Sequence, residues 1–185
     1  MAMLTGAMLR MTSVKTVGLC HSVQVCASTL LKHLDMPYDD QVQWKIAGIN
    51  HMAWLLEITR NGEDLYPEIK RRAAAITEKH DDMVRLEIMK RFGYYVTESS
   101  EHNAEYNPLF IKSRYPELIE QFNIPLDEYP RRCINQIKGW KEEKESILKD
   151  GKVEHTRSSE YASYIMEAMV TGNPYKIGGN VLNTG

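Results

Sequence analysis

The sequence lacks a strong net charge and lacks any long apolar run. Its 23 lysines and arginines nearly balance its 25 aspartates and glutamates, for a formal net charge of −2. A nucleic-acid-binding or anionic-membrane-binding protein usually shows an excess of basic residues. No apolar stretch approaches the roughly 20 residues that cross a bilayer. We therefore expect neither a nucleic-acid partner nor a membrane span.

Cysteine is also scarce, with three residues and no Cys-x-x-Cys pair. An odd, widely spaced set argues against a disulfide framework and against a closed four-ligand zinc site. The first fifteen residues are rich in Met and Leu, but Arg10 interrupts them and no small-residue cleavage site follows. This pattern does not predict a signal peptide, and a reducing cytoplasm is the expected location.

A glycine-rich dinucleotide motif is missing as well. The Gly-Gly pair at 178–179 follows an expected helix instead of opening one, and no GxGxxG occurs. The length of 185 residues suffices for one domain with a core. The chain begins inside an expected helix without a cap, and it stops just after an apolar Val-Leu pair. We expect residues 1–185 to form a partial domain, truncated at both ends.

Apolar periodicity predicts a helix-rich chain with a few strands, of the α+β or mixed α/β class. Helices are expected over 3–12, 22–34, 67–79, 81–92, 127–149 and 158–171. Strands are expected over 14–19, 42–49 and 53–60, with a turn at Asn61-Gly62. Residues 97–106 are expected to form a polar loop.

Two apolar segments end in residue types that can bind metals. "VGLCHSVQ", residues 17–24, places Cys20 beside His21, and "AGINHMAW", residues 47–54, contains His51. A thiolate and an imidazole together suit a divalent transition metal, and two protein ligands would leave positions open for catalysis. Equally, Cys20 is of a type often buried in cores, and His51 can be an ordinary hydrogen-bonded residue. His21 is either a proton donor or a surface histidine at a helix start.

The run "TESSEHNAEY", residues 97–106, gathers hydroxyl, carboxylate, amide and imidazole groups within ten positions. Such a mixture is what a sugar-binding site needs. A run this polar is also typical of a solvated loop, and composition alone does not separate the two interpretations.

Four motifs together are similar to one family. They are "VGLCHSVQ", "AGINHMAWLLEI", "GYYVTESSEHNAEY" and "EYASYIMEAMVTGNPYKIGGNVLNTG". In this order, over nearly the whole chain, they resemble glycoside hydrolase family 4, on its α-galactosidase side. The family is an NAD-dependent exception among glycosidases.

The resemblance implies an architecture and a chemistry. Members carry an N-terminal NAD-binding Rossmann domain, absent from this chain, followed by a mixed α/β domain related to that of lactate and malate dehydrogenases. They need a divalent metal, commonly manganese, and reducing conditions. Their reaction proceeds by oxidation at C3, deprotonation at C2, elimination, addition of water and reduction. The full-length enzyme is expected to be a homo-oligomer, and this chain alone is expected to be inactive.

The resemblance also assigns roles to single residues. Cys20 and His51 match the metal ligands, and His21 matches the group that assists the leaving oxygen. The base is expected to be Tyr106, with Tyr94 or Tyr95 as alternatives. Asn50 and His102 are expected sugar contacts.

The sugar itself stays open. An α-galactoside is the first expectation, and α-glucosides or α-galacturonides are alternatives within the family. A 2-hydroxy-acid dehydrogenase shares the architecture, but it needs no metal thiolate, and its His with an Arg clamp is not found here. A non-catalytic, truncated remnant is the remaining alternative.

Overall fold

The computed structural model describes residues 2–16, 18, 20–49, 51–153 and 160–173. The chain divides into two compact units, with Met1–Ile124 in the first and Pro125–Tyr175 in the second. Among its described residues, the second unit has the helices α7 (Glu128–Asp150) and α8 (Glu160–Thr171). The described parts are mixed α/β, as the sequence predicted.

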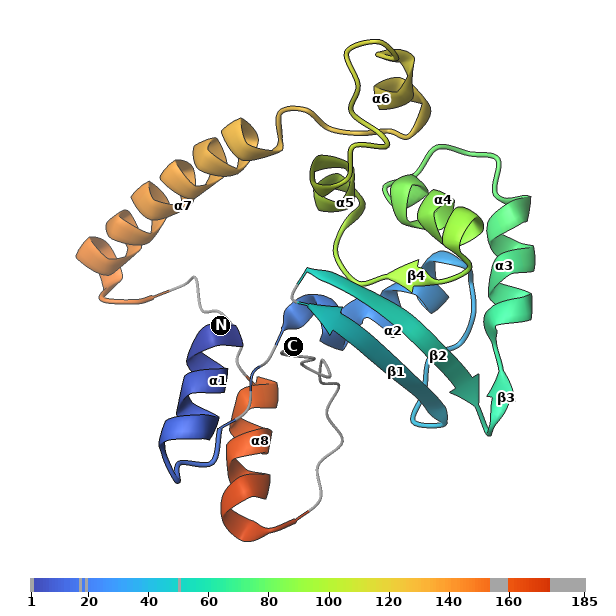
Figure 1. Ribbon diagram of the computed structural model, residues 1–185. Helices are drawn as coiled ribbons and strands as arrows, with labels where there is room; N and C mark the ends of the chain where they lie inside the picture. Colours follow the sequence, from blue (N-terminus) through green and yellow to red (C-terminus); the bar gives the residue numbers. More distant parts are fainter. Residues whose placement is uncertain (1, 17, 19, 50, 154–159, 174–185) are drawn as a thin grey trace. The chain divides into compact units, whose positions relative to one another are not determined.

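An antiparallel hairpin is the centre of the first unit. Strand β1 (Val42–Ile49) pairs with β2 (Met52–Arg60), and β2 pairs along its other edge with the short strands β3 (Glu63–Asp64) and β4 (Tyr95–Val96) (Figure 1). Lys45 lies opposite Glu57 but Ile46 lies opposite Leu55, so the register shifts between them. This irregularity lets Leu55 and Ile58 share the buried face of β2 although they are three residues apart.

Six helices of the first unit lie in the residues that the structure describes. Their bounds are α1 (Ala2–Met11), α2 (His21–His33), α3 (Tyr66–Ala75), α4 (Met83–Phe92), α5 (Ser100–Tyr106) and α6 (Glu117–Gln121). Helix α2 lies along one face of the hairpin (Figure 1) and buries the side chains of Val23, Cys26, Ala27, Leu30 and Leu31. Apolar residues at spacings of three and four thus form one stripe against the sheet.

Helix α4 has two buried faces. Leu86 and Met89 join the core between α2 and the sheet, whereas Val84 and Ile88 pack in a second cluster that includes Ala104 of α5. The helix ends at Gly93, which has the left-handed φ of 87° that a C-terminal cap requires. Through these two faces α4 connects the sheet to α5.

Most predicted elements are confirmed, but the strand expected over 14–19 is wrong for the residues that the structure describes there. Residues 14–16 and 18 belong to no strand. The Thr12 hydroxyl accepts from the Val14 amide at 3.2 Å, and the Thr16 hydroxyl donates to the Val14 carbonyl at 3.0 Å. These local bonds occupy backbone groups that a strand would offer to a neighbour.

The polar loop expected over 97–106 is also wrong, because most of it is helix α5. The side chain of Ser99 accepts a hydrogen bond from the His102 amide at 3.3 Å and caps the helix. The signal was present in the sequence, since a serine before a glutamate-containing turn favours a helix start. Helix α3 ends at Ala75, four residues before the predicted end, and is followed by extended backbone at Ile76.

Candidate functional site

The turn between β1 and β2 presents His51. Ile49 pairs with Met52, so the turn holds two residues, and Asn50 lies outside the described residues. His51 has a left-handed φ of 64°, an uncommon conformation for a residue with a side chain. Gly48 has a φ of 137°, and a Cβ there would lie 2.6 Å from the Met52 carbonyl oxygen. Only glycine fits this close approach, so the backbone at Gly48 fixes how the turn presents His51.

Cys20 and His21 lie where α2 begins. Cys20 is the N-cap residue, with extended φ and ψ of −137° and 128°, and it is partly buried against the core. His21 is the first helical residue and is exposed. A Cβ at Gly18 would lie 2.9 Å from the Thr5 hydroxyl oxygen, so α1 approaches this segment too closely for a larger residue. Packing against the core therefore holds Cys20 in place. The side chain of His21, in contrast, is accessible to solvent.

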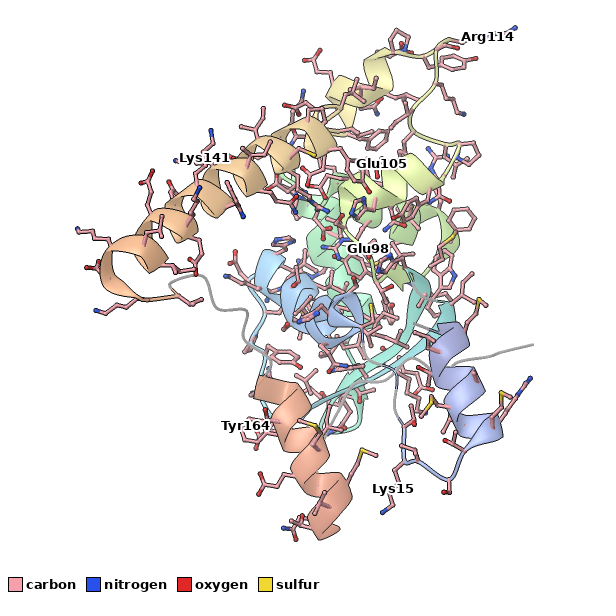
Figure 2. All side chains as sticks on the ribbon, turned by 90° about the vertical axis from the view of Figure 1, so that its left-hand side faces the viewer. Lys15, Glu98, Glu105, Arg114, Lys141 and Tyr164 are labelled. Carbon is pink, nitrogen blue, oxygen red and sulfur yellow. The ribbon has the colours of Figure 1, made fainter. Side chains whose placement is uncertain are left out.

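Glu98 connects these two segments. Its Oε2 accepts a hydrogen bond from the Ser22 hydroxyl at 2.9 Å and lies 3.3 Å from Nε2 of His51. Its Oε1 accepts from the Ser99 amide at 2.9 Å. The Glu98 side chain is 11% exposed and is labelled in Figure 2. The structure thus brings His51 and the first turn of α2, two residues after Cys20, to one carboxylate.

A metal held by Cys20 and His51 would occupy an open site and not a closed one. Within the described ranges, no three His, Cys, Asp or Glu side chains gather closely enough to hold a metal by themselves. Cys20 offers sulfur and His51 offers nitrogen, a pair of donors that suits a divalent transition metal. Two protein ligands leave coordination positions for water or substrate. The metal-ligand roles of Cys20 and His51 remain predictions.

Helix α5 carries the predicted base and one predicted sugar contact. The rings of His102 and Tyr106 stack, with centroids 5.6 Å apart and planes 10° from parallel. Nδ1 of His102 lies 2.8 Å from Oε2 of Glu105, and Tyr106 is 43% exposed. The side-chain amide of Asn103 donates to the backbone carbonyls of Glu98 and Ser99 at 2.8 and 3.0 Å. These bonds join α5 to the segment that carries Glu98.

The two alternative tyrosines differ in environment. Tyr94 is half-exposed and packs edge-to-face on Tyr66, with ring centroids 5.8 Å apart. Tyr95 is fully buried, and its hydroxyl donates to Oδ2 of Asp82 at 2.5 Å. Burial, and then the negative charge of Asp82, raise the pKa of Tyr95 well above its usual value near 10. A phenol that is enclosed and hard to ionise is a poor base, which argues against Tyr95.

A buried polar cluster around Asp82 was not found from the sequence. The carboxylate of Asp82 pairs with Nε of Arg85, accepts from Tyr95, and lies 3.3 Å from the Ser100 hydroxyl and 3.2 Å from Nδ1 of His33. Burial alone would raise the pKa of Asp82, but the hydrogen bonds and the Arg85 charge outweigh it and lower the pKa. The cluster ties α4 to β4 and to the first residue of α5.

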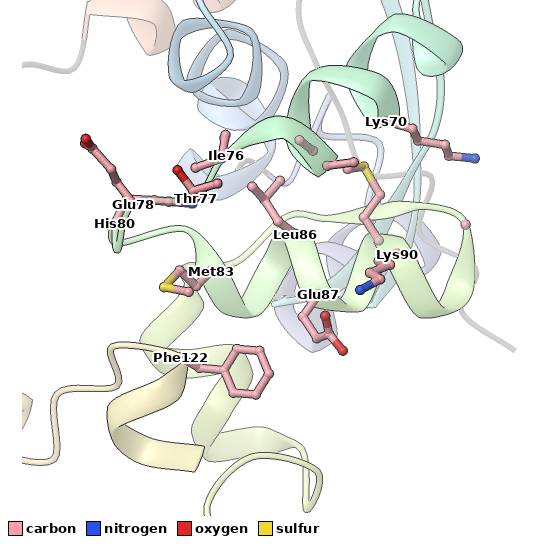
Figure 3. Close-up of a pocket in the computed structure, with 14 residues that line it drawn as sticks. Lys70, Ile76, Thr77, Glu78, His80, Met83, Leu86, Glu87, Lys90 and Phe122 are labelled. Carbon is pink, nitrogen blue, oxygen red and sulfur yellow. The ribbon is translucent and has the colours of Figure 1, made fainter. Parts of the chain in front are cut away.

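An apolar pocket of about 450 Å³ lies beside α3 and α4 (Figure 3). Its apolar lining includes Ile76, Leu86 and Phe122, and Lys90 and Glu87 also line it. None of the residues predicted from the sequence to bind metal or sugar lines this pocket. The residues predicted to carry the chemistry thus lie outside this pocket.

Comparisons with known proteins identify the family of this chain. Residues 46–185 match the model of the family 4 glycosyl hydrolase C-terminal domain, which places the chain among glycosidase domains. The chain belongs to glycoside hydrolase family 4, as its motifs indicated. It is 62% identical over 186 residues to an alpha-galactosidase of Bacillus subtilis (strain 168) and 33% identical over 198 residues to an alpha-galactosidase of Rhizobium meliloti (strain 1021).

Solved structures show the same fold at low sequence identity. The crystal structure of lplD from Bacillus subtilis superposes with a TM-score of 0.62 at 19% identity, over 84% of this chain and 40% of that one. A 6-phospho-alpha-glucosidase from gut microorganisms, in complex with NAD and Mn2+, superposes with a TM-score of 0.53 at 14% identity, over 91% of this chain and 40% of that one.

The match covers all of this chain but only part of the relatives. The chain spans 43% of the Bacillus subtilis alpha-galactosidase and 40% of the Rhizobium meliloti one. In the part of the chain that the structure describes, no helix combines the length and apolarity needed to cross a membrane.

Proposed function

We propose that this chain supplies the metal- and sugar-binding part of a cytoplasmic enzyme that hydrolyses α-galactosides. The observation that carries the proposal is the 62% identity with an alpha-galactosidase over the whole chain. The 33% identity with a second alpha-galactosidase supports the same substrate class. An α-glucoside or α-galacturonide is the alternative substrate within the family.

The proposed cofactors are NAD, bound outside this chain, and a divalent metal such as Mn2+. A neighbour in fold holds both groups, which supports the choice. When bound, NAD accepts and returns a hydride, and the metal stabilises negative charge on the sugar oxygens. Cys20 and His51 are the residues that would hold the metal. Reducing conditions keep Cys20 available as a ligand, because an oxidised sulfur no longer coordinates.

His21 and Tyr106 are proposed to move protons. His21 is exposed beside Cys20, so its imidazole can donate a proton to the departing glycosidic oxygen. Tyr106 is half-exposed on α5, and its phenolate would take the C2 proton of the sugar. A free phenol loses its proton only near pH 10, so this role needs positive charge close by. His102, which stacks on Tyr106, and Asn50 are the proposed sugar contacts.

A chimera tests the proposal. In it, this chain replaces the matching segment of the Bacillus subtilis alpha-galactosidase, and hydrolysis of aryl α-galactosides and aryl α-glucosides is measured with NAD and Mn2+. We expect the chimera to prefer the galactoside and the 185-residue chain alone to show no turnover. A chimera that folds and binds NAD but cleaves neither glycoside would contradict the proposal.

Cysteine variants of the chimera test the metal role. Cys20→Ser should abolish hydrolysis and leave NAD binding intact, since NAD binds elsewhere. Cys133→Ser is the matched control, because Cys133 is an exposed thiol on α7 and should not affect hydrolysis. Full activity of Cys20→Ser would remove Cys20 from the ligand set.

Deuterium incorporation tests the reaction route. Product formed by the chimera in heavy water should carry deuterium at C2, whereas a two-carboxylate displacement glycosidase leaves that position untouched. Tyr106→Phe should lower the exchange, and Tyr115→Phe, at another exposed tyrosine, should not. Exchange at the parental rate in Tyr106→Phe would mean that a different group is the base.

A further inference from the structure

Glu98 is a carboxylate in a nearly buried position with every oxygen engaged. The residue is 8% exposed, and its two oxygens contact the Ser99 amide, the Ser22 hydroxyl and the His51 imidazole. A carboxylate removed from water is costly unless such partners compensate it. The contacts with Ser22 and His51 join the first turn of α2 to the β1–β2 turn, which is far from α2 in sequence.

The backbone around Glu98 is itself held in place. The Thr97 amide donates to the carbonyl of Ala53 in β2 at 3.0 Å, and the Asn103 side chain donates to the Glu98 carbonyl at 2.8 Å. The sheet therefore fixes Glu98 on one side and α5 fixes it on the other. A side chain anchored in this way can hold its partners without losing much further conformational freedom.

We propose that Glu98 is a positioning residue for the metal site, holding the His51 imidazole beside the first turn of α2, which Cys20 precedes as the N-cap residue. The inference rests on the proposed function, because it takes Cys20 and His51 as the metal ligands. A carboxylate next to a ligating histidine commonly fixes the orientation of the ring. Here the same carboxylate oxygen also anchors Ser22, so one side chain sets the relative position of both ligand segments.

The conservative variant Glu98→Gln separates positioning from folding. The amide oxygen of glutamine can still accept from the Ser99 backbone amide and its NH2 group can donate to the Ser22 hydroxyl, but the negative charge that attracts the imidazole is lost. Glu57→Gln is the matched control, since Glu57 is an exposed carboxylate on β2 whose partner is Lys45 at 2.8 Å. Both variants are made in the 185-residue chain.

The first measurement is Mn2+ binding by the chain, followed from the loss of the free-ion electron paramagnetic resonance signal. We expect Glu98→Gln to weaken Mn2+ binding by about 10- to 100-fold, the range typical of an orienting carboxylate. Glu57→Gln should bind Mn2+ like the parent, and the melting temperature of Glu98→Gln should stay within a few degrees of the parent value. Unchanged Mn2+ binding by Glu98→Gln overturns the proposal.

The variant Cys20→Ser distinguishes a failure of the proposed role of Glu98 from a failure of the proposed metal site. If Cys20→Ser weakens Mn2+ binding and Glu98→Gln does not, the role of Glu98 is wrong and the metal site stands. If the parent chain binds no Mn2+, or Cys20→Ser binds it equally well, the metal assignment is wrong and the role of Glu98 falls with it.

A second readout needs no metal. The side-chain nitrogen resonances of His51 should move between the metal-free parent and metal-free Glu98→Gln, because the carboxylate 3.3 Å from Nε2 has lost its charge. Those of His102, whose partner Glu105 is unchanged, should not move. His51 resonances that stay in place would overturn the proposal.

Discussion

Helix α2 buries five of its thirteen residues, whereas α7, with twenty-three residues, buries none. Both were predicted as helices, and both are amphipathic. In α2 the apolar stripe faces the sheet. In α7 the large apolar side chains of Ile134, Ile137 and Trp140 are 66%, 57% and 64% exposed. The same kind of sequence pattern therefore yields a packed helix only where another element covers it.

What holds α7 as a helix is local. Glu128 pairs with Arg131 and Arg132, one helical turn on, and Lys138 lies 3.7 Å from Glu142. Gly151 ends the helix in a left-handed conformation with a φ of 65°. Exposed pairs of this spacing contribute only about 0.2–0.5 kcal/mol each. Side-chain changes in α7 should therefore affect the free energy of unfolding far less than changes in the first unit.

The largest effect is expected at Asp82. Asp82→Ala removes the partner of the buried Arg85 guanidinium and leaves that charge uncompensated. We expect a loss of about 3–5 kcal/mol in the free energy of unfolding. Urea unfolding, followed by the fluorescence of Trp44 and Trp54 in a Trp140→Phe background, measures the first unit. A loss below about 1 kcal/mol would mean that the cluster is not buried in solution.

Leu55→Ala and Ile137→Ser compare the two regions directly. Leu55 is fully buried, so Leu55→Ala should cost about 2–5 kcal/mol through lost contacts and a cavity. Ile137→Ser changes an exposed surface and should stay within about 0.5 kcal/mol. Circular dichroism during urea unfolding measures both variants. A cost above about 1 kcal/mol at Ile137 would show that another surface covers α7 in solution.

The pH dependence of the free energy of unfolding should reveal the buried ion pair of Asp82 and Arg85. The folded-state pKa of Asp82 is lowered, so its stabilisation is complete above the unfolded value of about 3.9 and is lost as the pH falls through the folded value. Unfolding of the parent should therefore become easier below about pH 4, with a shallower dependence in Asp82→Asn.

Salt distinguishes this effect from a surface contribution. Hydrogen bonds from Arg71 and Arg72 lower the pKa of the exposed Glu68 to about 2, but salt screens such a surface pair. The difference between the parent and Asp82→Asn should persist at high salt. Equal slopes in the two proteins would show that the charge of Asp82 does not contribute.

A smaller effect than at Asp82 or Leu55 is expected at the cap of α5. Ser99→Ala removes the acceptor for the His102 amide and should cost about 1 kcal/mol. Ser28→Ala is the control, because its hydroxyl bonds to the Val25 carbonyl inside α2 and caps nothing. Urea unfolding followed by tryptophan fluorescence measures both. Equal costs for the two serines would mean that α5 does not depend on its cap.

Local sequence was enough to predict the elements whose signals are local. The stripe in α2, Gly93 at the end of α4 and the turn at Asn61-Gly62 all act through neighbouring residues, and the structure confirms them. The errors at 14–19 and 97–106 arose where side chains of Thr12, Thr16 and Ser99 bond to nearby backbone groups. The spacing of apolar residues along the sequence does not reveal such hydrogen bonds.

The sequence by itself determined most of the longer helices, the strands over 42–49 and 53–60 and, through four separated motifs, membership of glycoside hydrolase family 4. Only the tertiary structure placed Glu98 against Ser22, 76 residues away, and against His51. It also gathered His33, Asp82 and Tyr95 into one buried cluster. Periodicity encodes which face of an element is apolar, but it does not encode which distant polar side chain meets that element. Those contacts arise when the chain packs and each buried polar group must find a partner.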